Sequence, residues 1–263
     1  MDSILRWAGS KRKLIPSLLD AVPQDFSRYV EPFCGSACLF LALNPERALI
    51  SDINRELIDT YREIRDHVEE VIGALSRRTV SEVEYYKLRA MDVSRLSAAQ
   101  KAARFLCLNR YCFNGIYRTN KAGTFNVPYG GRKSGCLPEA DRLRALSRRL
   151  NRATLNAESF EEALGKVRCG DFVYLDPPYS IRARRVFNAY SNQAFGPRQL
   201  ATLRDYLIRF DSAGIPFLVS YGFSREALIL GKGFRTRHVS VARHIAGFVT
   251  KRRRARELFI TNY

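Results

Sequence analysis

The sequence lacks the closely spaced pairs of cysteines that mark a structural metal site. It has six cysteines and three histidines among 263 residues, and no two cysteines are separated by only two residues. A zinc site of that kind is therefore not expected, and neither are disulfides in a reducing compartment. Four cysteines lie in apolar surroundings, which predicts small core residues: Cys34, Cys38, Cys107 and Cys169.

Long apolar runs are also missing. No stretch approaches the roughly 20 apolar residues that a membrane helix needs. A secretory signal has a basic segment followed by an apolar one. The start of the chain, Met1–Arg6, does not have this pattern. We expect a cytoplasmic protein that has no contact with a membrane.

Acidic residues are scarce relative to basic ones. Lys and Arg number 44 against 26 Asp and Glu, which leaves a net charge of +18. Such an excess favours a polyanionic partner, and a nucleic-acid phosphate backbone is the obvious one. The alternatives are a merely solvated basic surface and, with less support, a membrane surface. The 46% of apolar residues predicts a folded chain of one large domain, or a core domain with an insertion.

The beginning of the chain has the pattern of a nucleoside-binding α/β sheet. We predict a strand over 28–33, a turn at Gly35, a helix over 37–42 and a second strand over 47–52, which ends in Asp52. Gly35 and Asp52 are 17 residues apart, which suits a glycine that lets the backbone approach a ligand and an acid that accepts ribose hydroxyls. The three-glycine fingerprint is absent, which favours a cofactor without a pyrophosphate.

The region from about residue 76 to residue 149 does not show the alternation of strands and helices. A helix is predicted over 98–108, and a turn at 120–123 followed by an arm at 124–128 predicts a hairpin. A basic helix rich in arginine closes the region over 142–152. We interpret this part as an inserted recognition module.

The sheet pattern then resumes. Residues 172–176 have the apolar character of a buried strand, and 197–210 are predicted to be a helix. Further strands are predicted over 215–220, 238–241 and 258–261.

The stretch Asp176-Pro177-Pro178-Tyr179 follows the strand over 172–176, where ligands of open α/β sheets bind. An exocyclic amino group is a poor nucleophile, because its lone pair is delocalised into the ring. Asp176 and a proline carbonyl can accept its two hydrogens, and Tyr179 can stack on the base. The alternative is a rigid turn at the end of a strand with a capping acid. The motif favours methyl transfer to an amino group, which needs no metal.

With these motifs the chain resembles the Dam-like class of adenine-N6 DNA methyltransferases (D12 class, alpha group). The matching stretches keep the order of that family and cover nearly the whole chain: 6–11, 31–35, 51–54, 108–115, 125–128 and 174–179. The resemblance implies a Rossmann-like S-adenosylmethionine-dependent core, formed by residues 1–60 and 150–263. It also implies a mainly helical target-recognition domain with a β-hairpin over 61–149.

The resemblance further implies S-adenosylmethionine as cofactor, S-adenosylhomocysteine as product, and no metal. The residues implied to bind the cofactor are Trp7, Ala8, Gly9, Lys11, Glu31, Pro32, Phe33, Gly35, Asp52, Ile53, Ser159, Phe160 and Asp176. One position departs from the family, because Ala37 stands where the family has its second glycine. The backbone can still approach the cofactor if Ala37 keeps a negative φ.

Other residues match the family's DNA contacts. A target adenine must flip out of the duplex to be reached, and Phe113 and Asn114 match the segment that enters the stack. Arg118 and Arg6 match positions that read guanine, which makes GATC the first candidate for the target. The alternatives are core packing for Phe113 and phosphate contact or plain surface for the arginines. The basic run predicted to clamp phosphates is Lys251, Arg252, Arg253 and Arg254.

These observations predict adenine-N6 methylation of double-stranded DNA. The chain is expected to act as a monomer, associated with the nucleoid of a bacterium or encoded by a phage, with a cognate restriction endonuclease as a candidate partner. Two alternatives stay open: an enzyme that methylates RNA or another amino-bearing base, and a DNA-binding regulator with a decayed cofactor site.

Overall fold

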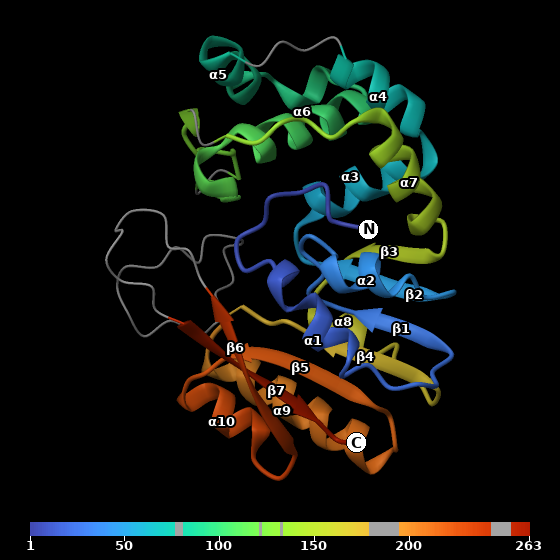
Figure 1. The fold of residues 1–263 in the computed structure, drawn as a ribbon. Helices are drawn as coiled ribbons and strands as arrows, with labels where there is room; N and C mark the ends of the chain where they lie inside the picture. Colours follow the sequence, from blue (N-terminus) through green and yellow to red (C-terminus); the bar gives the residue numbers. More distant parts are fainter. Residues whose placement is uncertain (77–80, 121–122, 132–133, 179–194, 243–253) are drawn as a thin grey trace.

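The computed structural model describes residues 1–76, 81–120, 123–131, 134–178, 195–242 and 254–263. Within these ranges seven strands form one sheet in the order β3-β2-β1-β4-β5-β7-β6 (Figure 1). The strands are β1 (Arg28–Glu31), β2 (Ala48–Asp52), β3 (Ala153–Ala157), β4 (Asp171–Leu175), β5 (Phe217–Gly222), β6 (Arg235–Ala242) and β7 (Arg254–Thr261). Strands β1 to β5 pair in parallel, and β7 is antiparallel to both of its neighbours.

The order of the strands creates a switch point between β1 and β4. From β1 the chain moves outward to β2 and then β3, and it returns on the other side of β1 as β4. Ligands of open α/β sheets bind outside the carboxyl ends of the strands at such a point. The mixed α/β architecture predicted for the core is confirmed.

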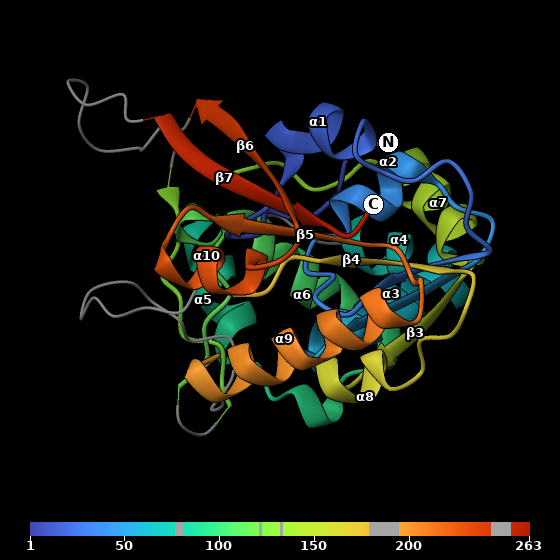
Figure 2. The same ribbon diagram turned by 90° about the horizontal axis from the view of Figure 1, so that it is seen from below.

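Alternate residues of the central strands enter two separate cores, as the period of a strand requires. Tyr29, Phe172 and Tyr174 belong to one core, whereas Val30 and Val173 belong to the other. Figure 2 shows the sheet between helices α1 and α2 on one side and α8 and α9 on the other. The helices of these two layers are α1 (Ile15–Leu19), which follows the 3-10 turn η1 (Arg12–Leu14), α2 (Cys38–Leu43), α8 (Phe160–Leu164), α9 (Pro197–Ser212) and α10 (Arg225–Gly231).

Helices dominate the chain between β2 and β3, and α4, α5 and α6 lie beyond the β3 edge of the sheet (Figure 1). They are α3 (Arg55–Asp66), α4 (Val68–Ser76), α5 (Glu82–Ala90), α6 (Ala98–Tyr111) and α7 (Ala140–Leu150), with the 3-10 turns η2 (Val93–Arg95) and η3 (Phe113–Gly115). A capping box at Ser97 and Gln100 fixes the start of α6. The division into a core and an inserted recognition domain over 61–149 stays a prediction.

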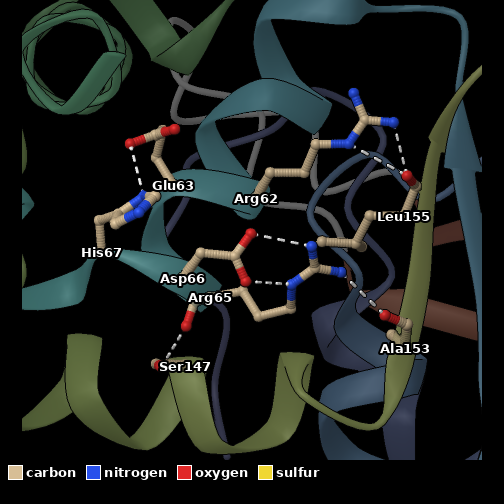
Figure 3. Close-up of polar contacts among 8 residues, drawn as sticks. All are labelled: Arg62, Glu63, Arg65, Asp66, His67, Ser147, Ala153 and Leu155. Atoms are coloured by element: carbon tan, nitrogen blue, oxygen red, sulfur yellow. Dashed lines mark hydrogen bonds and ion pairs between the residues drawn. The ribbon is translucent and has the colours of Figure 1, made fainter. Parts of the chain in front are cut away.

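Two arginines of α3 occupy the open edge of the sheet (Figure 3). Arg62 donates twice to the carbonyl of Leu155, at 3.1 and 2.7 Å, and Arg65 donates to the carbonyl of Ala153 at 3.3 Å. The carbonyls are two residues apart on β3, so both face outward from the edge. Ser147 of α7 donates to the carbonyl of Arg65 at 3.0 Å. Side chains thus satisfy an edge that would otherwise offer unpaired carbonyls to another chain.

Most predicted elements are confirmed within a few residues. No element was predicted where β3, α4, α5, α8 and α10 lie. Cys169 is exposed rather than a core residue. Cys34, Cys38 and Cys107 are buried as expected. In the described ranges, the structure has no helix whose length and apolar character would suit a membrane crossing.

Candidate active site

Three acidic residues converge at the carboxyl edge of the sheet. Glu31 is the last residue of β1, Asp52 is the last residue of β2, and Asp176 directly follows β4. Because these strands are parallel and adjacent, the three carboxylates come from separate segments of the chain to one edge. They surround the switch point of the sheet.

Asp52 holds the turn over residues 34–37, which we call the cofactor-binding turn. Its carboxylate accepts the N–H groups of Gly35 and Asn54, each at 2.9 Å. From the other side, Tyr61 of α3 donates its hydroxyl to the carbonyl of Gly35 at 2.9 Å. Gly35 has φ +44°, and a Cβ there would lie 2.7 Å from Nε1 of Trp7. The turn therefore needs glycine for its backbone conformation and for the close approach of the indole.

Ala37 ends the same turn with φ +49° and ψ +36°. The negative φ on which the approach of the backbone was conditional is therefore not found. The chain reverses sharply here, with Ala37 N–H bonded to the carbonyl of Cys34 at 2.6 Å, before it enters α2. An L-residue in this left-handed region costs roughly 1–2 kcal/mol, which a glycine would avoid. The family's glycine thus has a conformational reason, and the chain tolerates its loss.

Lys11 and Asp176 form an ion pair inside the site, with 2.8 Å between Nζ and Oδ1. The Lys11 side chain is 6% exposed and that of Asp176 is 20% exposed. Burial raises the pKa of Asp176, and the Lys11 ammonium opposes that rise. Glu257 of β7 lies 3.9 Å from the same ammonium and is 2% exposed. Its negative charge raises the pKa of Asp176 further.

Burial also raises the pKa of Glu31 and Asp52. Tyr29 donates its hydroxyl to Glu31 at 3.0 Å. Asp176 and Glu257 share the Lys11 ammonium, and no ion pair of Glu31 or Asp52 is found among the described residues. Buried carboxylates are costly unless a positive group offsets them. The site therefore suits a cationic ligand and disfavours a pyrophosphate, which fits a sulfonium cofactor with an amino group.

An apolar wall continues the site beyond Asp52. The Ile53 side chain is 45% exposed, and Ser159 caps α8 at the end of neighbouring β3. The Phe33 and Phe160 rings stack with centroids 5.3 Å apart, and Phe195 packs on the edge of Phe33. Residues predicted to frame an adenine are thus brought to adjacent strand ends.

The remaining predicted site residues differ in their surroundings. Pro32 and Pro177 are buried, whereas Ala8, Gly9 and Pro178 are exposed. Tyr179 lies outside the described residues.

Residues 112–120 and 123–131 form what we call the recognition segment. Phe113 is 48% exposed, and Asn114 is exposed with φ +55°. The exposure of Phe113 argues against ordinary core packing. A Cβ on Gly115 would lie 2.5 Å from Cβ of Arg6, so glycine lets the segment pass close to the chain start.

Arg6 and Arg118 flank this segment. The backbone of Arg6 is held on both sides by the Asn109 side chain, at 2.9 and 2.6 Å. Arg118 donates from Nε to Asn126 at 2.7 Å, across the single bridge between Thr119 and Phe125 that represents the predicted hairpin. Of the basic run, Lys251, Arg252 and Arg253 lie outside the described residues, and Arg254 begins β7.

The family model of the D12 class N6 adenine-specific DNA methyltransferases matches residues 7–245. The chain belongs to this family. The methyltransferase is 33% identical over 267 residues to the type II methyltransferase M1.LlaDCHI of Lactococcus lactis subsp. cremoris, which covers 98% of this chain and 94% of that protein. It is 33% identical over 250 residues to the retron Ec67 DNA adenine methylase of Escherichia coli, covering 93% and 86% of the two chains. The DNA adenine methylase of Escherichia coli K12 is 32% identical over 223 residues, covering 83% and 80%.

Family membership makes the chain an adenine-specific DNA methyltransferase, whose substrate is double-stranded DNA. The family also implies S-adenosylmethionine as cofactor. The structure adds Glu257 to the surroundings of Lys11 in this methyltransferase. The sequence analysis missed that residue because it follows a basic run, where an acid suggests a surface ion pair. The available signal was an acid directly before the apolar residues 258–260.

Proposed function

We propose that this methyltransferase transfers a methyl group from S-adenosylmethionine to N6 of an adenine flipped out of duplex DNA. The observation that carries the proposal is the ion pair of Lys11 with Asp176, which lies after β4 at the switch point, beside the cofactor-binding turn. The pair supports an acid that stays ionised although it is largely buried.

The chain's own residues would orient and activate the adenine amino group. When bound, S-adenosylmethionine supplies a methyl group on a cationic sulfur. An oxygen of Asp176 and the carbonyl of Pro177 would accept the two N6 hydrogens, which favours a pyramidal nitrogen with an available lone pair. Lys11 would keep Asp176 able to accept. Tyr179 and Pro178 would line the face of the flipped base.

The cofactor would contact the residues gathered at the carboxyl edge. Asp52 would hold the ribose, Glu31 and the backbone of the cofactor-binding turn would face the methionine part, and Ile53 and Phe160 would enclose the adenine. The other residues proposed to bind it are Trp7, Ala8, Gly9, Lys11, Pro32, Phe33, Ser159 and Asp176.

We further propose GATC as the target. Phe113 and Asn114 would fill the gap that the flipped adenine leaves, and Arg118 and Arg6 would read guanine in the major groove. The exposed Phe113 ring at a left-handed turn supports this assignment. Relatives named DNA adenine methylase also support it.

Transfer of labelled methyl groups tests the proposal. The purified methyltransferase is incubated with labelled S-adenosylmethionine and either a GATC duplex, a duplex with the adenine replaced, or RNA of the same sequence. Label in the GATC duplex alone is the expected result. Label in RNA would favour the alternative acceptor, and equal label in both duplexes would exclude GATC as the target.

Relatives with type II names support a role in which this chain, acting as a monomer, protects host DNA from a cognate endonuclease.

The competing function is a DNA-binding regulator that has lost its ability to bind the cofactor, for which the strained Ala37 is the one favourable observation. Calorimetric titration separates them, because a regulator would release no heat with S-adenosylmethionine.

A further inference from the structure

Tyr117 lies at the junction of the recognition segment and the cofactor-binding turn. It directly precedes Arg118 and is 7% exposed. Its ring packs against Phe105 of α6 and Phe125 of the recognition segment, each with centroids 5.6 Å apart. These contacts alone would make it an ordinary core residue. Two further contacts of Tyr117, with Trp7 and with Glu56, connect it to the cofactor-binding turn through different residues.

The first route is aromatic. The Trp7 ring stacks on Tyr117 with centroids 5.9 Å apart and an angle of 23° between the planes. The same indole occupies the space where Gly35 lacks a side chain, with Nε1 only 2.7 Å from the position of a Cβ. Trp7 is therefore in contact with the cofactor-binding turn and with the recognition segment at once.

The second route is polar. The Tyr117 hydroxyl donates to Oε2 of Glu56 at 2.5 Å. Glu56 lies in the first turn of α3, and the N–H of the preceding cap residue, Asn54, donates to Asp52. The other carboxylate oxygen of Glu56 lies 3.7 Å from the guanidinium of Arg104, which is 4% exposed. A hydrogen bond to a charged acceptor is stronger than a neutral one, so this route fixes the ring against rotation and sliding.

We propose that Tyr117 is a positioning residue that sets the recognition segment relative to the cofactor-binding turn, through its stack on Trp7 and its hydrogen bond to Glu56. The inference rests on the proposed function, in which Arg118 and Phe113 contact DNA and Asp52 contacts the cofactor. Tyr117 touches neither ligand. It couples the position of the recognition segment to that of the cofactor-binding turn, because both sets of contacts are made by the same rigid ring.

A consequence is that the two ligands bind cooperatively. A cofactor that orders Asp52 and Gly35 also orders Trp7 and α3, and hence the segment that carries Arg118. Such coupling is reciprocal and typically amounts to roughly 5–150-fold in affinity. A tyrosine with a purely structural role would change the affinity for DNA without changing its dependence on the cofactor.

The test measures the dissociation constant of a GATC duplex by fluorescence anisotropy, with and without saturating S-adenosylhomocysteine, which cannot methylate the DNA. The ratio of the two constants is the coupling factor. Tyr117→Phe should lower the factor by roughly tenfold, the value of a hydrogen bond to a charged group. Glu56→Gln keeps an acceptor oxygen but removes its charge, so it should lower the factor by less. The double variant should be no worse than Tyr117→Phe alone, because that substitution already removes the bond.

Tyr85→Phe is the matched control. Tyr85 is also buried and donates its hydroxyl to the carbonyl of Val127 at 2.9 Å, within the recognition segment. No contact of its hydroxyl with the cofactor-binding turn is found among the described residues. This variant should weaken DNA binding equally with and without S-adenosylhomocysteine, so that its coupling factor stays at the wild-type value.

The outcomes separate the inference from the function on which it rests. Wild-type protein that binds the duplex with a coupling factor of one overturns the role of Tyr117 and leaves the proposed function standing. An unchanged factor in Tyr117→Phe, or a factor equally reduced in Tyr85→Phe, also overturns it. Wild-type protein that does not bind the duplex contradicts both proposals.

Discussion

The carboxyl edge of the sheet and the recognition segment differ in how far their functional side chains are buried and in how many partners hold them. At the edge, the acidic residues at the carboxyl ends of β1, β2 and β4 are largely buried, and partners from elsewhere hold them, as Gly35 and Asn54 hold Asp52. In the recognition segment, Phe113 and Asn114 are exposed, and the backbone is held by turns and isolated bridges. Contacts within the protein hold the acids of the edge, whereas the exposed tip is available to a partner. Substitutions at the edge should therefore affect the chemistry, and substitutions at the tip should affect the choice of DNA.

The largest effect is expected for Asp176→Ala. Without its acceptor oxygen, kcat should fall roughly 1,000-fold, while duplex affinity in a binding assay stays within about twofold of wild type. Asp171→Asn is the control at the other end of β4, where Asp171 pairs with Arg28 at 2.6 Å. It should lower the free energy of unfolding but spare kcat. Equal loss of turnover and DNA binding in Asp176→Ala would mean that this acid is structural.

A pair of variants should move the acid limb of the pH profile of kcat in opposite directions. Asp176 is a charged acceptor for the N6 hydrogens only when ionised, so activity is lost as the pH falls through its raised pKa. Lys11→Met removes the cation that lowers this pKa, and the limb should move to higher pH. Glu257→Gln removes a charge that raises it, and the limb should move to lower pH. Shifts in the same direction would exclude Asp176 as the titrating group.

Phe113→Ala tests the exposed tip. We expect kcat/KM for a matched duplex to fall about tenfold, because no ring fills the gap left by the flipped adenine. A mismatch opposite the target should recover part of the loss, since the base then costs less to unstack.

Phe223→Ala is the control for Phe113→Ala, because Phe223 is 44% exposed and lies outside the recognition segment. Both variants should change the free energy of unfolding by no more than about 0.5 kcal/mol. An equal loss of kcat/KM in the two variants would refute the role assigned to Phe113.

The smallest effect is expected for Ala37→Gly. Relief of about 1–2 kcal/mol of left-handed strain is offset by the greater entropy of glycine in the unfolded chain and by the lost methyl contacts. The free energy of unfolding, measured in urea, should stay within about 0.5 kcal/mol of wild type. Ala163→Gly makes the same change at a buried position of α8 and should lower it by about 1 kcal/mol. A similar loss in both would mean that Ala37 is not strained.

The elements with strong patterns could be predicted from the sequence. Residues 172–175 of β4 are apolar and buried, and α9 is long with a set of buried leucines, so the strand over 172–176 and the helix over 197–210 were predicted. Strand β3 was missed because Ala153–Ala157 carries small and polar residues and lies at the edge of the sheet. Its pairing with β2 depends on a parallel neighbour about 100 residues earlier, which no local pattern reports.

The residues of the candidate site likewise fall into those that a local pattern could predict and those that it could not. The conspicuous Asp176-Pro177-Pro178 stretch and the position of Gly35 before Asp52 were visible as local patterns. The partners that tune them were not, because Glu257 reaches Lys11 across 246 residues, and Glu56 reaches Tyr117 across 61 residues. The left-handed Ala37 also depends on how the turn closes. Long-range contacts, rather than residue types, determine these features.

The arginines at the β3 edge bear on how the protein responds to salt. Arg62 and Arg65 use their donors on carbonyls of the protein itself, and Arg104 does the same inside the helical region. Such side chains release no ions from DNA, although they contribute to the net charge of +18. The fall of duplex affinity with rising salt should therefore report far fewer phosphate contacts than that charge suggests.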